Sequence, residues 1–164
     1  MAKTVQALAP RQEMLRFFFD AMLQGYVSVG PKGTIPELPG SKTKRWISGP
    51  YELYDVWFTN SNNDYSCGDT FIWKDGVLVW KMSYQGRYPQ QYIDFLKSAL
   101  KQSYKTSHFC GGRGPVVFQQ GQLTYVNQIT SLLSDNHCIT GREEISDNGG
   151  VQGWHTYQVL FLID

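Results

Sequence analysis

Charged residues are scarce in this chain of 164 residues, since Asp, Glu, Lys and Arg make up only 18% of it. An average globular domain has roughly 25%. The 15 basic and 14 acidic residues leave a formal net charge of +1 at pH 7. A basic surplus is the electrostatic signature of proteins that bind nucleic acids or anionic membranes. We therefore expect neither a nucleic acid nor a membrane as a partner.

Long apolar runs and paired cysteines are missing as well. The longest purely apolar run, Val159 to Ile163, is far shorter than the ~20 residues that span a bilayer. The N-terminal segment has no apolar stretch of signal-peptide length. Cys67, Cys110 and Cys138 form no C-x-x-C pair, which is typical of reduced thiols. Together these features favour a cytoplasmic protein.

Aromatic and uncharged polar side chains take the place of the missing charge. Five Trp, ten Tyr and nine Phe supply 15% of the sequence. So many large apolar side chains argue against intrinsic disorder, because disordered chains are poor in aromatic residues. The length is enough to bury one hydrophobic core. We expect a single domain over residues 1–164.

Two segments have the apolar spacing of helices. One begins at Pro10 and ends at Gly25, and the other begins at Pro89. Each Pro can occupy a first helical position, where its missing N–H costs nothing. Residues 30–45 hold three Pro and three Gly, which predicts a long surface loop or lid. Runs of β-forming residues separated by turn residues predict strands at 52–59, 70–73, 77–84, 116–119, 122–129, 141–146 and 154–163.

The chain also resembles itself. The two helical segments align with each other, and several later features match in the same order. Aromatic residues recur in equivalent places, namely Phe17 and Phe95, Tyr26 and Tyr104, Tyr54 and Tyr125, and Trp80 and Trp154. The common order indicates an internal duplication. We predict an α+β fold with two pseudo-symmetric halves, about 11–88 and 89–164. Each half is a helix plus antiparallel strands, and the halves share one core.

Four motifs stand out along the chain. They are Tyr-x-x-Tyr-Asp at 51–55, Val79-Trp80-x-Met82-x-Tyr84-x-Gly86, Arg113-Gly114-Pro115 and Gly141-x-Glu143-x-Ile145. In these motifs the chain resembles an uncharacterised bacterial domain-of-unknown-function family over about residues 14–163. The resemblance implies a domain that occurs alone or behind helix-turn-helix regulators of the XRE type. The first Gly-x-Glu-x-Val motif of that family reads Gly68-Asp69-Thr70-Phe71-Ile72 here, so Thr70 replaces the expected carboxylate.

Glu143 is the leading candidate for a binding residue, because its counterpart in the first half is Thr70. If Glu143 points inward among aromatic rings, it would form a site for a cationic, partly apolar ligand. Alternatively, Glu143 faces water or pairs with Arg142 or Arg113. The aromatic residues expected around it are Trp80, Trp154, Tyr54, Tyr84 and Tyr125.

Asp55 and Arg113 are two further candidates. Asp55 aligns with Val126, so it has no acidic counterpart, and it either contacts a ligand or makes a structural hydrogen bond. Arg113 lies in a Gly-Gly-Arg-Gly-Pro segment whose backbone N–H groups either meet an anion or only form a turn. Without a following helix and Lys, this segment is not a P-loop.

The histidines and cysteines predict neither a metal site nor a catalytic pair. The His-x-Cys and His-Cys spacings around Cys110 and Cys138 do not match zinc patterns. A nucleophilic pair of Cys110 with His155 has no local signature. We therefore expect no metal and no cofactor, and we favour a binding role over catalysis.

We expect a small-molecule-binding or sensor-type domain, with an aromatic cleft between the halves that takes a small apolar or cationic molecule. The predicted topology resembles the GyrI-like effector-binding domains, which bind lipophilic or cationic molecules between two halves. One alternative is a protein-interaction or homodimerisation module that uses exposed aromatic strands. Another is an enzyme in which Glu143, Asp55 or a histidine performs acid/base work. The aromatic residues without a counterpart, Trp46, Trp57 and Trp73, are further places to look for function.

Overall fold

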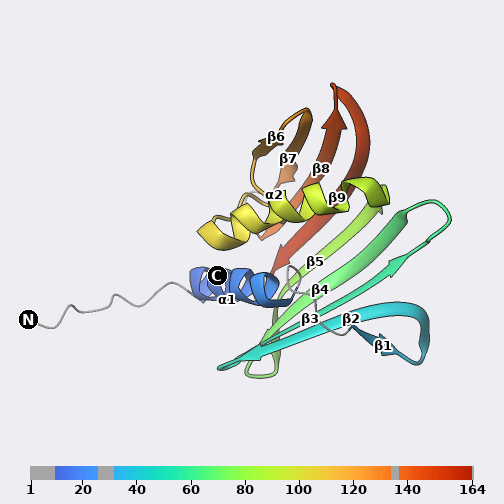
Figure 1. Ribbon diagram of the computed structural model, residues 1–164. Coiled ribbons are helices and arrows are strands. Elements are labelled where there is room, and N and C mark those ends of the chain that lie inside the picture. Colours follow the sequence, from blue (N-terminus) through green and yellow to red (C-terminus); the bar gives the residue numbers. More distant parts are fainter. Residues whose placement is uncertain (1–9, 26–31, 134–136, 164) are drawn as a thin grey trace, which may run out of the picture.

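The computed structural model describes residues 10–25, 32–133 and 137–163. Within these ranges, nine strands form one antiparallel sheet in the order β1-β2-β3-β4-β5-β9-β8-β7-β6, and two helices lie against one of its faces (Figure 1). The helices are α1 (Pro10–Gly25) and α2 (Ile93–Thr106), with a short 3-10 turn at Gln90–Tyr92 before α2. The strands are β1 (Gly33–Ile35), β2 (Leu38–Ser48), β3 (Tyr51–Thr59), β4 (Tyr65–Lys74), β5 (Val77–Arg87), β6 (Val117–Gln120), β7 (Leu123–Leu132), β8 (Cys138–Asp147) and β9 (Gly150–Phe161).

The two helices cover one face of the sheet, which we call the covered face. Helix α1 packs on β2 and β3, helix α2 packs on β6 and β7, and the helices contact each other. Aromatic rings join the layers, as where Phe18 of α1 lies 5.0 Å from Trp80 of β5 between ring centroids. Apolar residues at helical spacing give α1 this buried side, as the sequence predicted. The hydrophobic core lies between the helices and the covered face.

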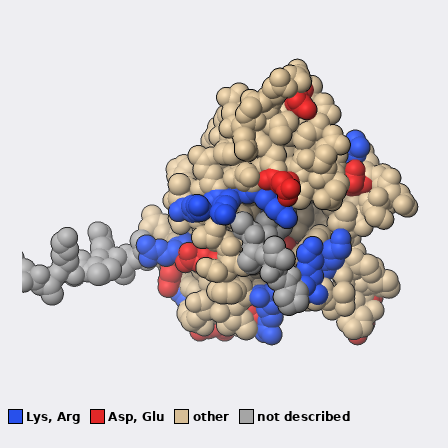
Figure 2. Space-filling model, viewed as in Figure 1, with Lys and Arg blue, Asp and Glu red and all other residues tan. Residues whose placement is uncertain are grey.

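Charge is distributed unevenly over the surface. Figure 2 shows Lys and Arg gathered along α2, where Lys97, Lys101 and Lys105 are exposed at a spacing of four residues. None of the helices in the described residues is long and apolar enough to cross a membrane.

The predicted α+β fold of two helix–strand halves is wrong. The molecule is predominantly β, and a single sheet runs through the expected boundary because β5 pairs with β9 from Trp80↔Phe161 to Arg87↔Trp154. Backbone hydrogen bonds thus continue from one expected half into the other. The internal duplication stays a prediction, and Tyr26 of its alignment lies outside the described residues.

The long loop expected over residues 30–45 is wrong as well. Gly33–Ile35 and Leu38–Ser48 form a hairpin at one edge of the sheet, while residues 30 and 31 lie outside the described part of the chain. Proline is tolerated at such an edge because its missing N–H is not needed by a neighbouring strand. The Pro and Gly content therefore marks the end of the sheet.

Candidate functional site

A cluster of polar side chains is buried on the covered face, beneath the loop that joins α2 to β6. Glu143 of β8 is 0% exposed, and Arg113 of the loop is 4% exposed. The Arg113 Nη2 atom donates to Glu143 Oε2 at 2.8 Å, and the Arg113 backbone N–H donates to Oε1 at 2.8 Å. One carboxylate thus binds both the side chain and the backbone of Arg113. A buried charge requires this kind of pairing to offset its lost hydration.

The glycines around Arg113 let the loop approach the sheet closely. A Cβ atom on Gly114 would overlap the hydroxyl group of Tyr125, so a larger residue would lift the loop off the sheet. Asn127 of β7 holds the loop from below, because its Nδ2 donates to the carbonyl oxygens of Cys110 at 3.0 Å and Gly114 at 3.2 Å. The Gly-Gly-Arg-Gly-Pro segment is therefore a docked structural loop.

Arg113 also fixes the protonation of His155. The guanidinium group can only donate, and its Nη2 lies 3.2 Å from His155 Nδ1, so Nδ1 accepts and the ring proton is on Nε2. Nε2 lies 3.0 Å from Ser66 Oγ and donates to it. Burial and the Arg113 charge lower the pKa of His155 to about 2. A neutral ring in this tautomer cannot take a proton from Ser66, so these residues are not a hydrolase triad.

Asp55 of β3 lies near this cluster and is 3% exposed. Its Oδ1 accepts hydrogen bonds from Thr70 Oγ1 at 2.7 Å and Tyr84 Oη at 3.1 Å. Burial raises the pKa of the Asp55 carboxyl, more than the two hydrogen bonds and the Arg113 charge lower it. The Arg113 guanidinium lies 5.0 Å from the centre of the Tyr84 ring. Tyr84 therefore contacts both Asp55 and Arg113.

The structure brings five of the predicted site residues together. Glu143, Arg113, Tyr84, Asp55 and Tyr125 lie in or beside the buried cluster. Burial and then the Glu143 charge raise the pKa of Tyr125 well above its usual value. Glu143 makes the ion pair with Arg113 that was one of the expected alternatives. Whether any of these residues binds a ligand stays a prediction.

The other three predicted residues lie elsewhere. Trp80 is 0% exposed in the core beneath α1. Trp154 and Tyr54 lie on the opposite face of the sheet, where Trp154 contacts Arg142 and Tyr54 pairs with Phe71 across β3 and β4. The aromatic cleft expected around Glu143 is therefore not what the structure has.

Sequence reasoning missed Asn127 and Ser66 in this cluster. Asn127 accepts from the Tyr157 hydroxyl at 2.8 Å, as Asp55 accepts from Tyr84. The alignment of the two halves came within one position of Asn127, because it placed Asp55 on Val126. Neighbouring residues of a strand point to opposite faces, so an alignment shifted by one position matches a residue of one face with a residue of the other.

We call the second face of the sheet the open face; among the residues that the structure describes, no helix lies over it and three ion pairs lie on it. These are Arg45–Glu52 at 2.6 Å, Lys81–Asp69 at 2.9 Å, and Arg142–Glu144. Each of these pairs joins one basic and one acidic side chain, so the pairs add no net charge to the face.

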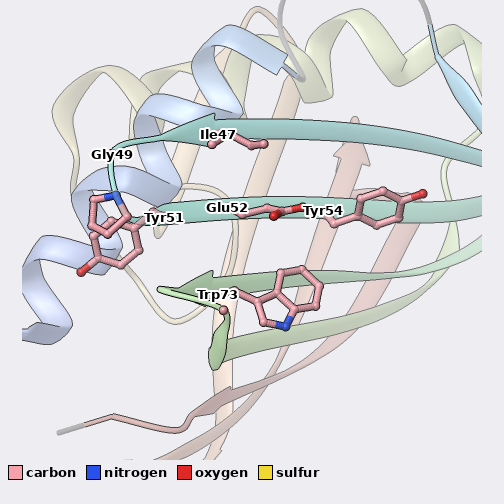
Figure 3. Close-up of a pocket in the computed structure, with 8 residues that line it drawn as sticks. Ile47, Gly49, Tyr51, Glu52, Tyr54 and Trp73 are labelled. Carbon is pink, nitrogen blue, oxygen red and sulfur yellow. The ribbon is translucent and has the colours of Figure 1, made fainter.

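A pocket of about 360 Å³ lies on the open face at the end of β2, β3 and β4 (Figure 3). We call it the Glu52 pocket. Ile47, Glu52 and Trp73 lie side by side on the three strands, and Tyr54 follows Glu52 on the same side of β3. The turns at Gly49-Pro50 and Gly76 close its end. Hydrogen bonding to Arg45 lowers the pKa of Glu52.

Two more hollows lie on the open face. The larger, of about 680 Å³, crosses β4, β5, β9 and β8 in the middle of the sheet, and we call it the central hollow. The other, of about 470 Å³, is lined mainly by apolar groups and includes Phe58, Tyr65 and Trp154. In the described residues, no group of three or more His, Cys, Asp or Glu side chains is placed to hold a metal ion.

Comparison with known proteins gives one match. The family model of a domain of unknown function, DUF5680, matches residues 55–161, from the third strand to the last. No curated protein and no solved structure matches the chain. The matched segment contains the whole buried cluster and the whole lining of the central hollow. Because it spans well over half of the sequence, the chain belongs to the DUF5680 family.

Proposed function

We propose that this chain is a small-molecule-binding domain and that its ligand is a small, cationic, partly apolar molecule held in the Glu52 pocket. The observation that carries the proposal is the position of Glu52, between Ile47 and Trp73 on neighbouring strands and next to Tyr54. Aromatic faces attract cations, and a carboxylate beside them adds a full opposite charge. The pocket volume falls within the usual range of ligand sites.

Arg45 is the present partner of the Glu52 carboxylate, which it contacts at 2.6 Å. Its side chain is 58% exposed and that of Glu52 is 33% exposed. Exposed ion pairs contribute little to stability, so an incoming ammonium group can replace Arg45 at small cost. The displaced guanidinium would remain in water. Glu52 is thus a carboxylate whose present partner is easily exchanged.

The test uses choline as a cationic probe and 3,3-dimethylbutan-1-ol as its uncharged analogue of the same shape. We expect choline to quench Trp fluorescence and to bind about tenfold more tightly than the alcohol. Glu52→Gln should abolish this preference, and Trp73→Ala should weaken both ligands. Glu144→Gln is the matched control, because Glu144 belongs to a similar exposed ion pair elsewhere on the open face. Equal binding of the two probes would overturn the proposal.

A second candidate, a homodimerisation or protein-interaction module, is favoured by one observation. Val117 of β6 and Val126 of β7 are register partners on the open face at the edge of the sheet, and they are 53% and 37% exposed. Val116, which precedes Val117 in the sequence, is exposed as well. Contiguous exposed apolar residues mark interaction surfaces. Light scattering during gel filtration tests this, and a dimer that Val117→Lys converts to a monomer would support it.

A further inference from the structure

The central hollow differs from the Glu52 pocket in its chemistry. Register places Ser83, Gln158 and Thr140 in one row across β5, β9 and β8, with Gln85 and Thr156 in the next row. All five side chains are uncharged, and each has both a donor and an acceptor. An exposed protein surface usually carries many charges of both signs. These rows in the middle of the open face are therefore poor in charge, as the sequence is overall.

The Lys81–Asp69 ion pair borders the first row, and Ser83 contacts its carboxylate. Asp69 Oδ1 accepts from Ser83 Oγ at 2.6 Å and lies 2.9 Å from Lys81 Nζ. Both contacts end on the same carboxylate oxygen, so neither uses Oδ2. An oxygen that accepts next to an ammonium group that donates is suited to two hydroxyl groups on adjacent carbon atoms, because each hydroxyl both donates and accepts.

Aromatic rings lie beside the hollow on β3 and β4, and Phe71 adjoins its lining at Lys81. Lys81 lies 5.5 Å from the centre of the Phe71 ring, and Phe71 stacks on Trp73 at 5.6 Å between centroids. Phe58 lines the hollow at its other border. Flat rings beside hydrogen-bonding groups suit a ligand with one apolar face and several hydroxyls.

We infer that the central hollow binds a neutral saccharide, with Asp69 and Lys81 on vicinal hydroxyls and Phe71 against the C–H face of a sugar ring. An anionic ligand would meet Asp69, and a cationic one would meet Lys81. A wholly apolar ligand would remove the Ser, Thr and Gln groups from water without replacing their hydrogen bonds. A neutral polyhydroxyl ligand avoids all three costs. The linings of this hollow and of the Glu52 pocket share no residue, and the inference does not rest on the ligand proposed for that pocket.

The experiment measures binding of the full chain to four neutral oligosaccharides: maltohexaose, cellohexaose, xylohexaose and chitohexaose. Two-dimensional amide NMR spectra report both affinity and location. We expect at least one sugar to shift amides of β4, β5 and β9, with the largest shifts around Asp69 and Ser83. Asp69→Ala and Phe71→Ala should each weaken that sugar about tenfold, because each removes one principal contact.

Two controls separate the outcomes. Glu52→Gln should leave sugar binding unchanged, so failure of the Glu52 pocket and failure of this inference are distinguishable. Lys101→Ala on α2 tests for nonspecific effects, and circular dichroism shows whether each variant is folded. The inference is overturned if none of the four sugars binds, or if sugar binding survives in folded Asp69→Ala. It is also overturned if the amide shifts arise only from dilution of a self-associated protein, because the same shifts would then appear on dilution without sugar.

Discussion

Two tyrosines lie opposite each other where β5 pairs with β9, and their surroundings are alike in shape and different in charge. Tyr84 and Tyr157 are register partners. Each ring covers a glycine, Gly68 under Tyr84 and Gly141 under Tyr157, where a Cβ atom would overlap the hydroxyl group. Each hydroxyl donates to a buried side chain, that of Asp55 in one region and that of Asn127 in the other.

The difference lies in how buried charge is compensated. Beside Asn127, Glu143 has Arg113 as a partner at 2.8 Å. Beside Asp55, the register partner is Thr70, and the carboxyl accepts hydrogen bonds from two hydroxyl groups. The same backbone arrangement thus holds an ion pair in one region and a carboxyl with a raised pKa in the other. The ion pair in the first region is possible because a loop places the Arg113 cation beside Glu143.

The largest expected effect is that of removing this cation. Arg113→Ala leaves Glu143 buried without its partner and should lower the free energy of unfolding by about 3–5 kcal/mol, measured by urea denaturation. The double variant Arg113→Met with Glu143→Leu should recover much of the loss. Arg142→Ala, which breaks the exposed pair with Glu144, is the control and should change little. A loss in Arg113→Ala no greater than in this control would show that the loop does not compensate Glu143.

Gly68→Ala and Gly141→Ala test whether the two tyrosines are equally constrained. Each added methyl group forces its tyrosine away from the strand, and each variant should lose about 1–3 kcal/mol of stability in the same assay. Gly150→Ala is the control, since the nearest atom to its Cβ would be the Gln152 amide nitrogen at 3.4 Å. A large loss in one variant and none in the other would break the comparison between the regions.

His155→Gln should change how stability depends on pH. The unfolded chain binds a proton near the ordinary pKa of 6.5, whereas the folded ring does not until about pH 2. The unfolded state therefore binds more protons between these values, and wild-type stability should fall by up to about 1.4 kcal/mol per unit as pH drops below 6.5. His155→Gln should lose this component. The control variant His108→Gln, which changes an exposed histidine, should keep this pH-dependent component. An unchanged slope in His155→Gln would contradict the assignment of the component to His155.

Asp55→Asn should have the smallest effect and the opposite dependence on pH. The raised pKa of Asp55 means that its ionised form is disfavoured in the folded state. Wild-type stability from this group is present below the unfolded pKa of 3.8 and is lost as pH rises toward the folded pKa. Relative to wild type, Asp55→Asn should therefore become more stable as the pH rises above 3.8. A constant difference across this range would mean that Asp55 does not titrate there.

The parts of the fold that depend on local spacing were predictable. Helix α1 begins at Pro10 and ends at Gly25 as predicted, because its apolar spacing and its end residues are adjacent in sequence. The pairing of β5 with β9 was not, since it joins residues 67 to 81 positions apart and no local pattern specifies it. The edge strands were missed because Pro and Gly are common both in loops and at sheet edges.

The candidate site was predictable in part for the same reason. Glu143 stood out because it replaced Thr70 in the alignment, and it is indeed buried. Its partner comes from a loop whose position depends on the whole fold, so sequence could only name Arg113 as one alternative. The alignment placed Trp80 on Trp154 although they face opposite sides of the sheet. Side chains alternate along a strand, and without the register an alignment cannot tell the two faces apart.

The sheet ends on both sides in very short strands. The outermost strands, β1 and β6, have three and four residues, whereas those between them have nine to twelve. An unpaired strand edge can add a strand from another molecule, and short outer strands limit this route to aggregation. Loss of residues 33–35 would uncover Leu38 to Thr43, the part of β2 that β1 pairs with. The small hairpin at this edge therefore covers the first half of β2 with a strand too short to offer a long edge of its own.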